Sequence, residues 1–89
     1  MAEFTVEFSQ EAKKFLTKQD KSIANMILSW IKKNLMGTDD PRRTGKALHG
    51  EYKGSWRYRV GDYRLIAHID DTKVTILILT IGHRSIVYK

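Results

Sequence analysis

The sequence predicts a small α+β domain, built from an N-terminal strand, a helical hairpin and a three-strand antiparallel meander. Apolar residues alternate over residues 3–8, recur with helical period over 9–37, and form β-branched and aromatic runs separated by short turns over 56–89. The apolar stripe of the helices needs a surface to cover, and the apolar face of the meander is the only one long enough. We therefore expect the helices to pack on the meander.

Length and composition limit the class of protein. The 89 residues leave room for one domain, spanning residues 1–89, and no apolar run approaches the roughly 18 residues of a membrane span. The absence of cysteine excludes a disulfide framework and a thiolate zinc site, and it suits a reducing compartment, so we expect a cytoplasmic protein. The net charge of +6 favours an anionic partner, whether nucleic acid, an acidic protein or an anionic membrane surface.

The first 37 residues predict one strand and two helices. Residues 3–8 form a half-buried strand, whose neighbour in the sheet the sequence leaves open. Ser9 is placed to cap a helix that ends near Lys18. Asp20 is placed to cap a second helix, which Gly37 ends because glycine adopts a left-handed conformation readily.

A polar loop is expected over residues 38–53, with Pro41, Gly45 and Gly50 as breakers. Long loops in small domains often carry function, although a solvated connector explains this one as well. Its cationic side chains and histidine would extend a positive surface toward the meander: Arg42, Arg43, Lys46, His49 and Lys53.

The first meander strand separates charge from apolar side chains. Because strand residues alternate between faces, Arg57 and Arg59 share one side, while Trp56, Tyr58 and Val60 share the other. One face of the sheet is therefore expected to be cationic. Such a face, with tyrosines available for stacking, suggests RNA as the substrate.

Two further arginines strengthen this expectation. Arg64 and Arg84 fall on or beside strands next to Arg57 and Arg59, and converging guanidinium groups repel one another unless an anion lies among them. Tyr63 suits either base stacking or the core. The arginine positions predict an anion site.

Other familiar catalytic patterns are missing from the sequence. It has no glycine-rich phosphate loop and no metal-binding spacing of histidines or carboxylates, so we expect no metal and no cofactor. His68, in the middle of a strand, is expected to be structural. His49 and His83 flank arginine-rich segments, where they either transfer protons near neutral pH or only add to a basic surface.

Several segments resemble RelE-type toxins of the RelE/ParE toxin-antitoxin superfamily. The resemblance covers the whole chain, and its most specific parts are the Gly61-Asp62-Tyr63-Arg64 turn and the terminal His83-Arg84-Ser85-Ile86-Val87-Tyr88. It implies a microbial ribonuclease-like fold and a ribosome-dependent endoribonuclease that cleaves messenger RNA in the ribosomal A site and so inhibits translation. Its implied partners are the ribosome, messenger RNA and a cognate antitoxin.

The resemblance also implies an active site. Arg64 and Arg84 would contact the scissile phosphate and Tyr88 would lie near the attacking 2′-hydroxyl, with Arg57 and Arg59 on the same face. Attack without a metal ion would leave a 2′,3′-cyclic phosphate and a 5′-hydroxyl. The expected substrate-binding residues are Lys46, His49, Lys53 and His83.

Two departures from the family leave the general base and acid open. Arg57 and Arg59 stand where close relatives have lysines, and Lys46 stands where some have a glutamate; because arginine stays protonated, His49 and Tyr88 are considered as acceptors instead. From the sequence we also expect no extra C-terminal helix of the kind that some relatives have. Two alternatives stay open: a ParE-like inhibitor of DNA gyrase and a non-catalytic nucleic-acid-binding module.

Overall fold

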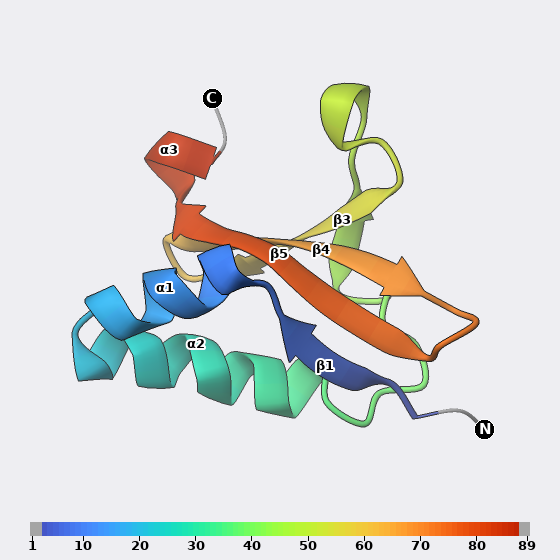
Figure 1. The fold of residues 1–89 in the computed structure, drawn as a ribbon, viewed down its shortest axis with the longest axis horizontal. Coiled ribbons are helices and arrows are strands. Elements are labelled where there is room, and N and C mark those ends of the chain that lie inside the picture. Colours follow the sequence, from blue (N-terminus) through green and yellow to red (C-terminus); the bar gives the residue numbers. More distant parts are fainter. Residues whose placement is uncertain (1–2, 88–89) are drawn as a thin grey trace.

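The α+β architecture expected from the sequence is confirmed in a computed structural model that describes residues 3–87. The sheet has five strands in the order β1-β5-β4-β3-β2; β1 runs parallel to β5 and the other neighbours are antiparallel (Figure 1). In chain order the elements are β1 (Thr5–Phe8), α1 (Gln10–Lys18), α2 (Lys21–Asn34), β2 (Gly45–Ala47), the 3-10 helix η1 (Gly50–Tyr52), β3 (Ser55–Val60), β4 (Tyr63–Asp70), β5 (Thr75–His83) and α3 (Arg84–Val87).

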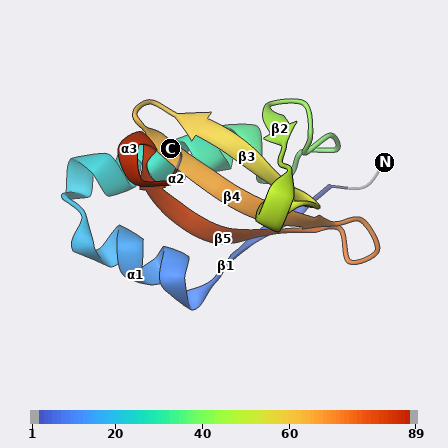
Figure 2. The same cartoon turned by 90° about the horizontal axis from the view of Figure 1, so that it is seen from above.

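Helices α1 and α2 lie together on one face of the sheet (Figures 1 and 2). The predicted cap of α1 is present: Ser9 Oγ accepts the Ala12 N–H at 3.0 Å and donates to the Leu79 carbonyl at 2.7 Å, which also ties the helix to β5. Gly37 follows α2 with a φ of 76°, the left-handed conformation expected there. No described helix is long and apolar enough to cross a membrane.

The core fills the space between these two helices and the sheet. The predicted apolar face of β3 is confirmed, because Tyr58 and Val60 are buried and Trp56 packs against the core. The largest fully buried side chains of this core are Tyr58, Ile27, Ile31, Leu35, Leu65, Ile76 and Ile78.

The prediction of a continuous loop over residues 38–53 is wrong in two places. Residues Gly45–Ala47 form β2, paired with β3, and Gly50–Tyr52 form η1. A Gly-Lys-Ala segment has little intrinsic strand preference, so its strand conformation comes from its partner and not from local sequence. The meander is correspondingly the central part of a larger sheet.

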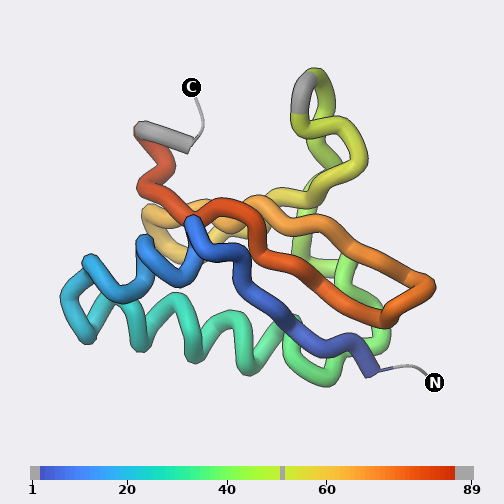
Figure 3. The backbone as a smooth tube through the Cα atoms, in the orientation of Figure 1, coloured from blue at the N-terminus to red at the C-terminus, as the bar shows by residue number. Residues whose placement is uncertain are grey.

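The second face of the sheet carries two projections. We call residues 48–54, which include η1, the arm; the arm and α3 both rise on the side away from α1 and α2, as the ribbon and the backbone trace show (Figures 1 and 3). Side chains of β2, β3 and β4 that alternate away from the core point toward this second face.

Candidate active site

A pocket of about 410 Å³ lies where strands β2, β3 and β4 present their side chains on the second face. Of the lining residues that the structure describes, four are cations that the sequence pointed to, and the fifth, Thr44, was not predicted. The lining consists of Thr44, Lys46, Arg57, Arg59 and Arg64. Among the described residues, this lining holds four cations and no carboxylate, which suits an anionic ligand.

Strand pairing places like charges side by side in this pocket. Lys46 on β2 lies opposite Arg57 on β3, and Arg59 on β3 lies opposite Arg64 on β4. Like charges directly opposite each other on antiparallel strands are destabilising. The arrangement therefore favours a bound anion that reduces the repulsion.

Arg64 is the buried member of the set, with 7% of its surface exposed. Its Nη1 donates to the carbonyls of Gly61 at 3.0 Å and Tyr63 at 2.9 Å, which fixes the guanidinium at the base of the β3–β4 turn. Its partner on β5 is Gly82, which adds no side chain there. The pKa of Arg64 is lowered, first by burial and then by neighbouring cations, chiefly Arg59. A nearby anion would stabilise the charged form of this guanidinium.

Arg84 begins α3 and stands at the same end of the sheet. Its backbone N–H donates to the Asp62 carbonyl at 2.8 Å, and its side-chain Nε lies 3.9 Å from Asp62 Oδ1. The side chain is 59% exposed and is absent from the lining of the pocket. Its charge nevertheless contributes to lowering the pKa of Arg64, so the two guanidinium groups are within electrostatic reach.

The histidines selected from the sequence stand outside this lining. His83 pairs with Tyr63, and their rings meet edge to face at 5.6 Å; Tyr63 in turn contacts Phe15 of α1 at 6.0 Å. His83 therefore lies on the helix side of the sheet. His49 precedes η1 on the arm and is exposed.

The remaining residues named from the sequence also lie outside the pocket lining or outside the described part of the chain. Lys53 lies on the arm, just after η1, and is exposed. Tyr88 lies outside the described residues. His68, expected to be structural, is on β4 with an exposed side chain. Among the residues that the structure describes, no group of three or more His, Asp or Glu side chains could hold a metal ion.

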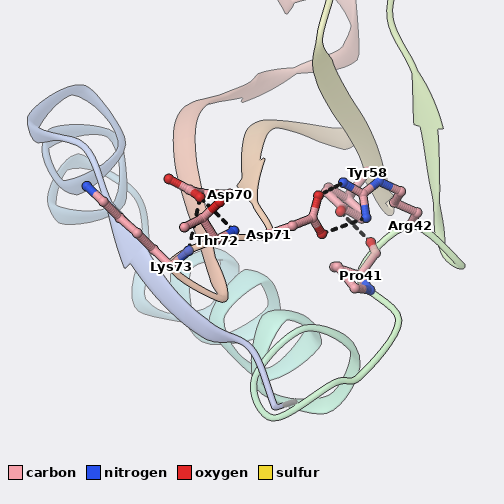
Figure 4. Close-up of polar contacts among 7 residues, drawn as sticks. All are labelled: Pro41, Arg42, Tyr58, Asp70, Asp71, Thr72 and Lys73. Carbon is pink, nitrogen blue, oxygen red and sulfur yellow. Dashed lines mark hydrogen bonds and ion pairs between the residues drawn. The ribbon is translucent and has the colours of Figure 1, made fainter. Parts of the chain in front are cut away.

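A network behind the pocket was also missed by the sequence analysis (Figure 4). The hydroxyl of Tyr58 donates to the Pro41 carbonyl at 2.5 Å, and burial raises the pKa of Tyr58 to about 12. Arg42 forms a two-point ion pair with Asp71, at 3.1 and 2.7 Å, and its guanidinium lies 5.7 Å from the centre of the Trp56 ring. The network anchors the segment that leads to Thr44. No local sequence pattern identified it, since its partners lie far apart along the chain.

Comparison with known proteins relates the sequence of this chain to one family. The family described as the ParE toxin of the type II toxin-antitoxin system matches residues 6–88. The chain is similar to Toxin RelG of Mycobacterium tuberculosis, with 34% identity over 86 residues that cover 97% of each chain.

Solved structures agree with this relationship. The chain resembles one in the RelBE2 toxin-antitoxin complex of M. tuberculosis, with a TM-score of 0.83, 34% identity, and coverage of 92% of this chain and 99% of that one. An archaeal RelE–RelB complex from Pyrococcus horikoshii OT3 gives a TM-score of 0.72 at 24% identity, covering 93% of this chain and 97% of that one, and so supports the fold alone.

Proposed function

This chain belongs to the RelE/ParE superfamily of type II toxin-antitoxin toxins, and on that premise we propose that it is a ribosome-dependent endoribonuclease that cleaves messenger RNA in the ribosomal A site. The observation that supports this activity best is the pocket in which Lys46, Arg57, Arg59 and Arg64 converge. A phosphodiester is the anion that such a pocket fits, because several guanidinium groups can donate to its oxygens at once.

The proposed reaction is an intramolecular transesterification, in which the ribose 2′-oxygen replaces the 5′-oxygen on phosphorus. The 2′-oxygen of the ribose loses its proton and attacks phosphorus, the bond to the 5′-oxygen breaks, and the departing oxygen takes up a proton. The products are a 2′,3′-cyclic phosphate and a 5′-hydroxyl. Negative charge grows on the phosphoryl oxygens during this step, and fixed cationic donors in a poorly hydrated site stabilise it well.

Arg64 has the geometry for that stabilising role. Its Nη1 is held by two backbone carbonyls, which leaves the N–H groups of Nε and Nη2 for phosphoryl oxygens. Burial excludes much of the water that would weaken the interaction. Arg59, opposite it on β3, supplies a second guanidinium, and Arg84 approaches from α3.

The proton transfers require other groups, because arginine stays protonated at neutral pH. Tyr88 is proposed near the attacking hydroxyl, and His49, on the arm, is the alternative acceptor. Weak acids and bases suffice if the ribosome holds the RNA in the geometry of attack, since positioning alone can supply a large part of the rate enhancement.

A cognate antitoxin is the second partner we propose. The RelBE2 structure and the P. horikoshii structure are both toxin-antitoxin complexes. An acidic or amphipathic antitoxin segment would neutralise the cationic face of this chain while the cell grows. Co-expression of the neighbouring small open reading frames should restore growth to cells that produce the toxin, and failure of all of them would contradict this part of the proposal.

Inhibition of DNA gyrase is the second candidate, because the family that matches is named for ParE toxins. An inhibitor that acts by binding a protein has no need of a pocket built from four cations. A non-catalytic nucleic-acid-binding module would use the charge but would not require fixed donors around one phosphate. The pocket therefore favours the nuclease over both.

Primer extension on messenger RNA separates these candidates. After brief induction, the wild-type chain should produce cuts that follow the reading frame, whereas Arg64→Gln, which removes the buried charge, should produce few or none. A gyrase inhibitor would leave the messages intact and would instead change DNA supercoiling. Intact messages in cells arrested by the wild-type chain would overturn the nuclease proposal.

A further inference from the structure

Gly45, at the start of β2, lies against the ring of Tyr58. The two residues are paired across β2 and β3, so their side-chain directions point to the same face of the sheet. A Cβ added to Gly45 would stand 2.8 Å from Tyr58 Cε1, closer than side chains tolerate, and 3.2 Å from the Arg57 carbonyl oxygen, which is a tight contact. Glycine thus lets β2 approach the Tyr58 ring directly.

Tyr58 is itself held in place by contacts with α2 and with Pro41. Its side chain is fully buried and its ring meets that of Trp30 on α2 at 5.8 Å. Its hydroxyl donates to the Pro41 carbonyl, and since the pKa of Tyr58 is raised to about 12, the group remains a neutral donor at ordinary pH. One rigid ring thereby fixes the chain at Pro41 and again at Gly45.

The two residues that flank Gly45 are the pocket-lining residues Thr44 and Lys46. We propose that Gly45 and Tyr58 are positioning residues, which act from the core side of the sheet and set where Thr44 and Lys46 stand relative to the three arginines across the pocket. This inference rests on the proposed nuclease function. Displacement of a substrate-contacting group by about 1 Å can lower a rate roughly 10²-fold, so a contact behind the pocket is able to control the reaction.

A purely structural role for the pair makes a different prediction. Loss of packing at Gly45 would then lower stability and the amount of folded protein, but each folded molecule would cleave normally. A positioning role instead lowers the rate per folded molecule, and it does so through Lys46. The two roles are separated by kinetics combined with a double-mutant cycle.

The experiment measures single-turnover cleavage of message on purified ribosomes, well below the melting temperature of every variant. Gly45→Ala should slow cleavage roughly 10-fold to 100-fold by moving β2 outward without changing any charge. In a Lys46→Ala background the same substitution should cost less than about threefold, because the cation that it displaces is already missing. Ile27→Val, which weakens packing of a fully buried α2 residue remote from the pocket, is the matched control and should cleave at the wild-type rate.

Tyr58→Phe keeps the test decisive if Gly45→Ala fails to fold. It retains the ring under Gly45 and removes only the hydroxyl that holds Pro41, so cleavage should fall by roughly threefold to tenfold, again with little further loss in the Lys46→Ala background. Two results would overturn the positioning role while leaving the nuclease function intact. One is a wild-type cleavage rate in both Gly45→Ala and Tyr58→Phe; the other is an equal loss of cleavage rate with Lys46 present and with Lys46→Ala. A wild-type chain that cuts no message would overturn the proposed function and this inference with it.

Discussion

Arg59 and Arg64 stand directly opposite each other on β3 and β4, so two guanidinium groups face the same small pocket from adjacent strands. Arg64 is buried while Arg59 is exposed, and the two differ in how they are held. Arg64 is fixed by backbone carbonyls and has little freedom to avoid its neighbour. The free protein therefore carries repulsion at the place where the substrate phosphate is proposed to bind, which is the stability cost often found at functional sites.

Removal of one of these charges should stabilise the free protein. Arg59→Gln is expected to raise the free energy of unfolding by roughly 0.5 kcal/mol, since opposed like charges on paired strands are unfavourable by about that amount. Thermal unfolding should show the gain at about 0.02 M salt and a smaller gain at about 0.5 M salt, where charges are screened. Lys13→Gln, at an exposed site on α1, is the control for a simple change in net charge. A destabilised Arg59→Gln would contradict the repulsion.

Arg84 provides a kinetic test of the proposed site. If its guanidinium stabilises charge that appears only in the transition state, Arg84→Ala should lower single-turnover cleavage by roughly 10²–10³-fold, with a much smaller loss of ribosome affinity. Arg43→Ala is the matched control, because Arg43 is also exposed but lines a separate hollow near the end of α2. Equal losses of affinity and of rate would instead assign Arg84 to ground-state binding.

The arginine face could be predicted because its geometry is local. Arg57 and Arg59 share a side of one strand, and the Gly61-Asp62 turn is short enough to bring Arg64 beside them. The helices were also predictable, since Ser9 caps the start of α1 and Gly37 follows the end of α2, and both act within a few residues.

The parts that sequence could not supply depend on distant contacts. β2 is a strand because it pairs with β3, where Gly45 lies against Tyr58, and this pairing sets Lys46 opposite Arg57. β1 lies parallel to β5, the last strand of the chain, and its own alternation does not specify so distant a partner. The burial of Arg64 follows from neighbours on two other strands.

Tyr88 remains a prediction of the sequence, because it lies outside the described residues. Tyr88→Phe removes a hydroxyl and little else, so it should preserve folding and antitoxin binding. If that oxygen takes part in proton transfer, single-turnover cleavage should fall by roughly 10²–10⁴-fold, and toxicity on induction should fall with it. Wild-type cleavage by this variant would remove Tyr88 from the catalytic set and direct the next alanine substitutions to His49 and His83.

Tyr58 should make the stability of the protein sensitive to alkaline pH. Its pKa is raised from 10.0 to about 12 by burial, so between these values the unfolded chain loses the phenolic proton while the folded chain keeps it. Stability from this residue is therefore fully present below pH 10 and is lost as the pH rises toward 12. By pH 11 the loss amounts to roughly 1.4 kcal/mol.

The comparison with Tyr58→Phe isolates this effect, because every other ionisable group is common to both chains. Near pH 8 the Phe variant should be less stable by roughly 1 kcal/mol, since it lacks the hydrogen bond to Pro41. Since phenylalanine has no proton to lose, that deficit should shrink as the pH rises past 10 and be reversed by pH 11, where the loss of roughly 1.4 kcal/mol exceeds it. Urea unfolding of both proteins across this range measures the difference directly, and a deficit that stays constant with pH would show that the Tyr58 hydroxyl is not buried as described.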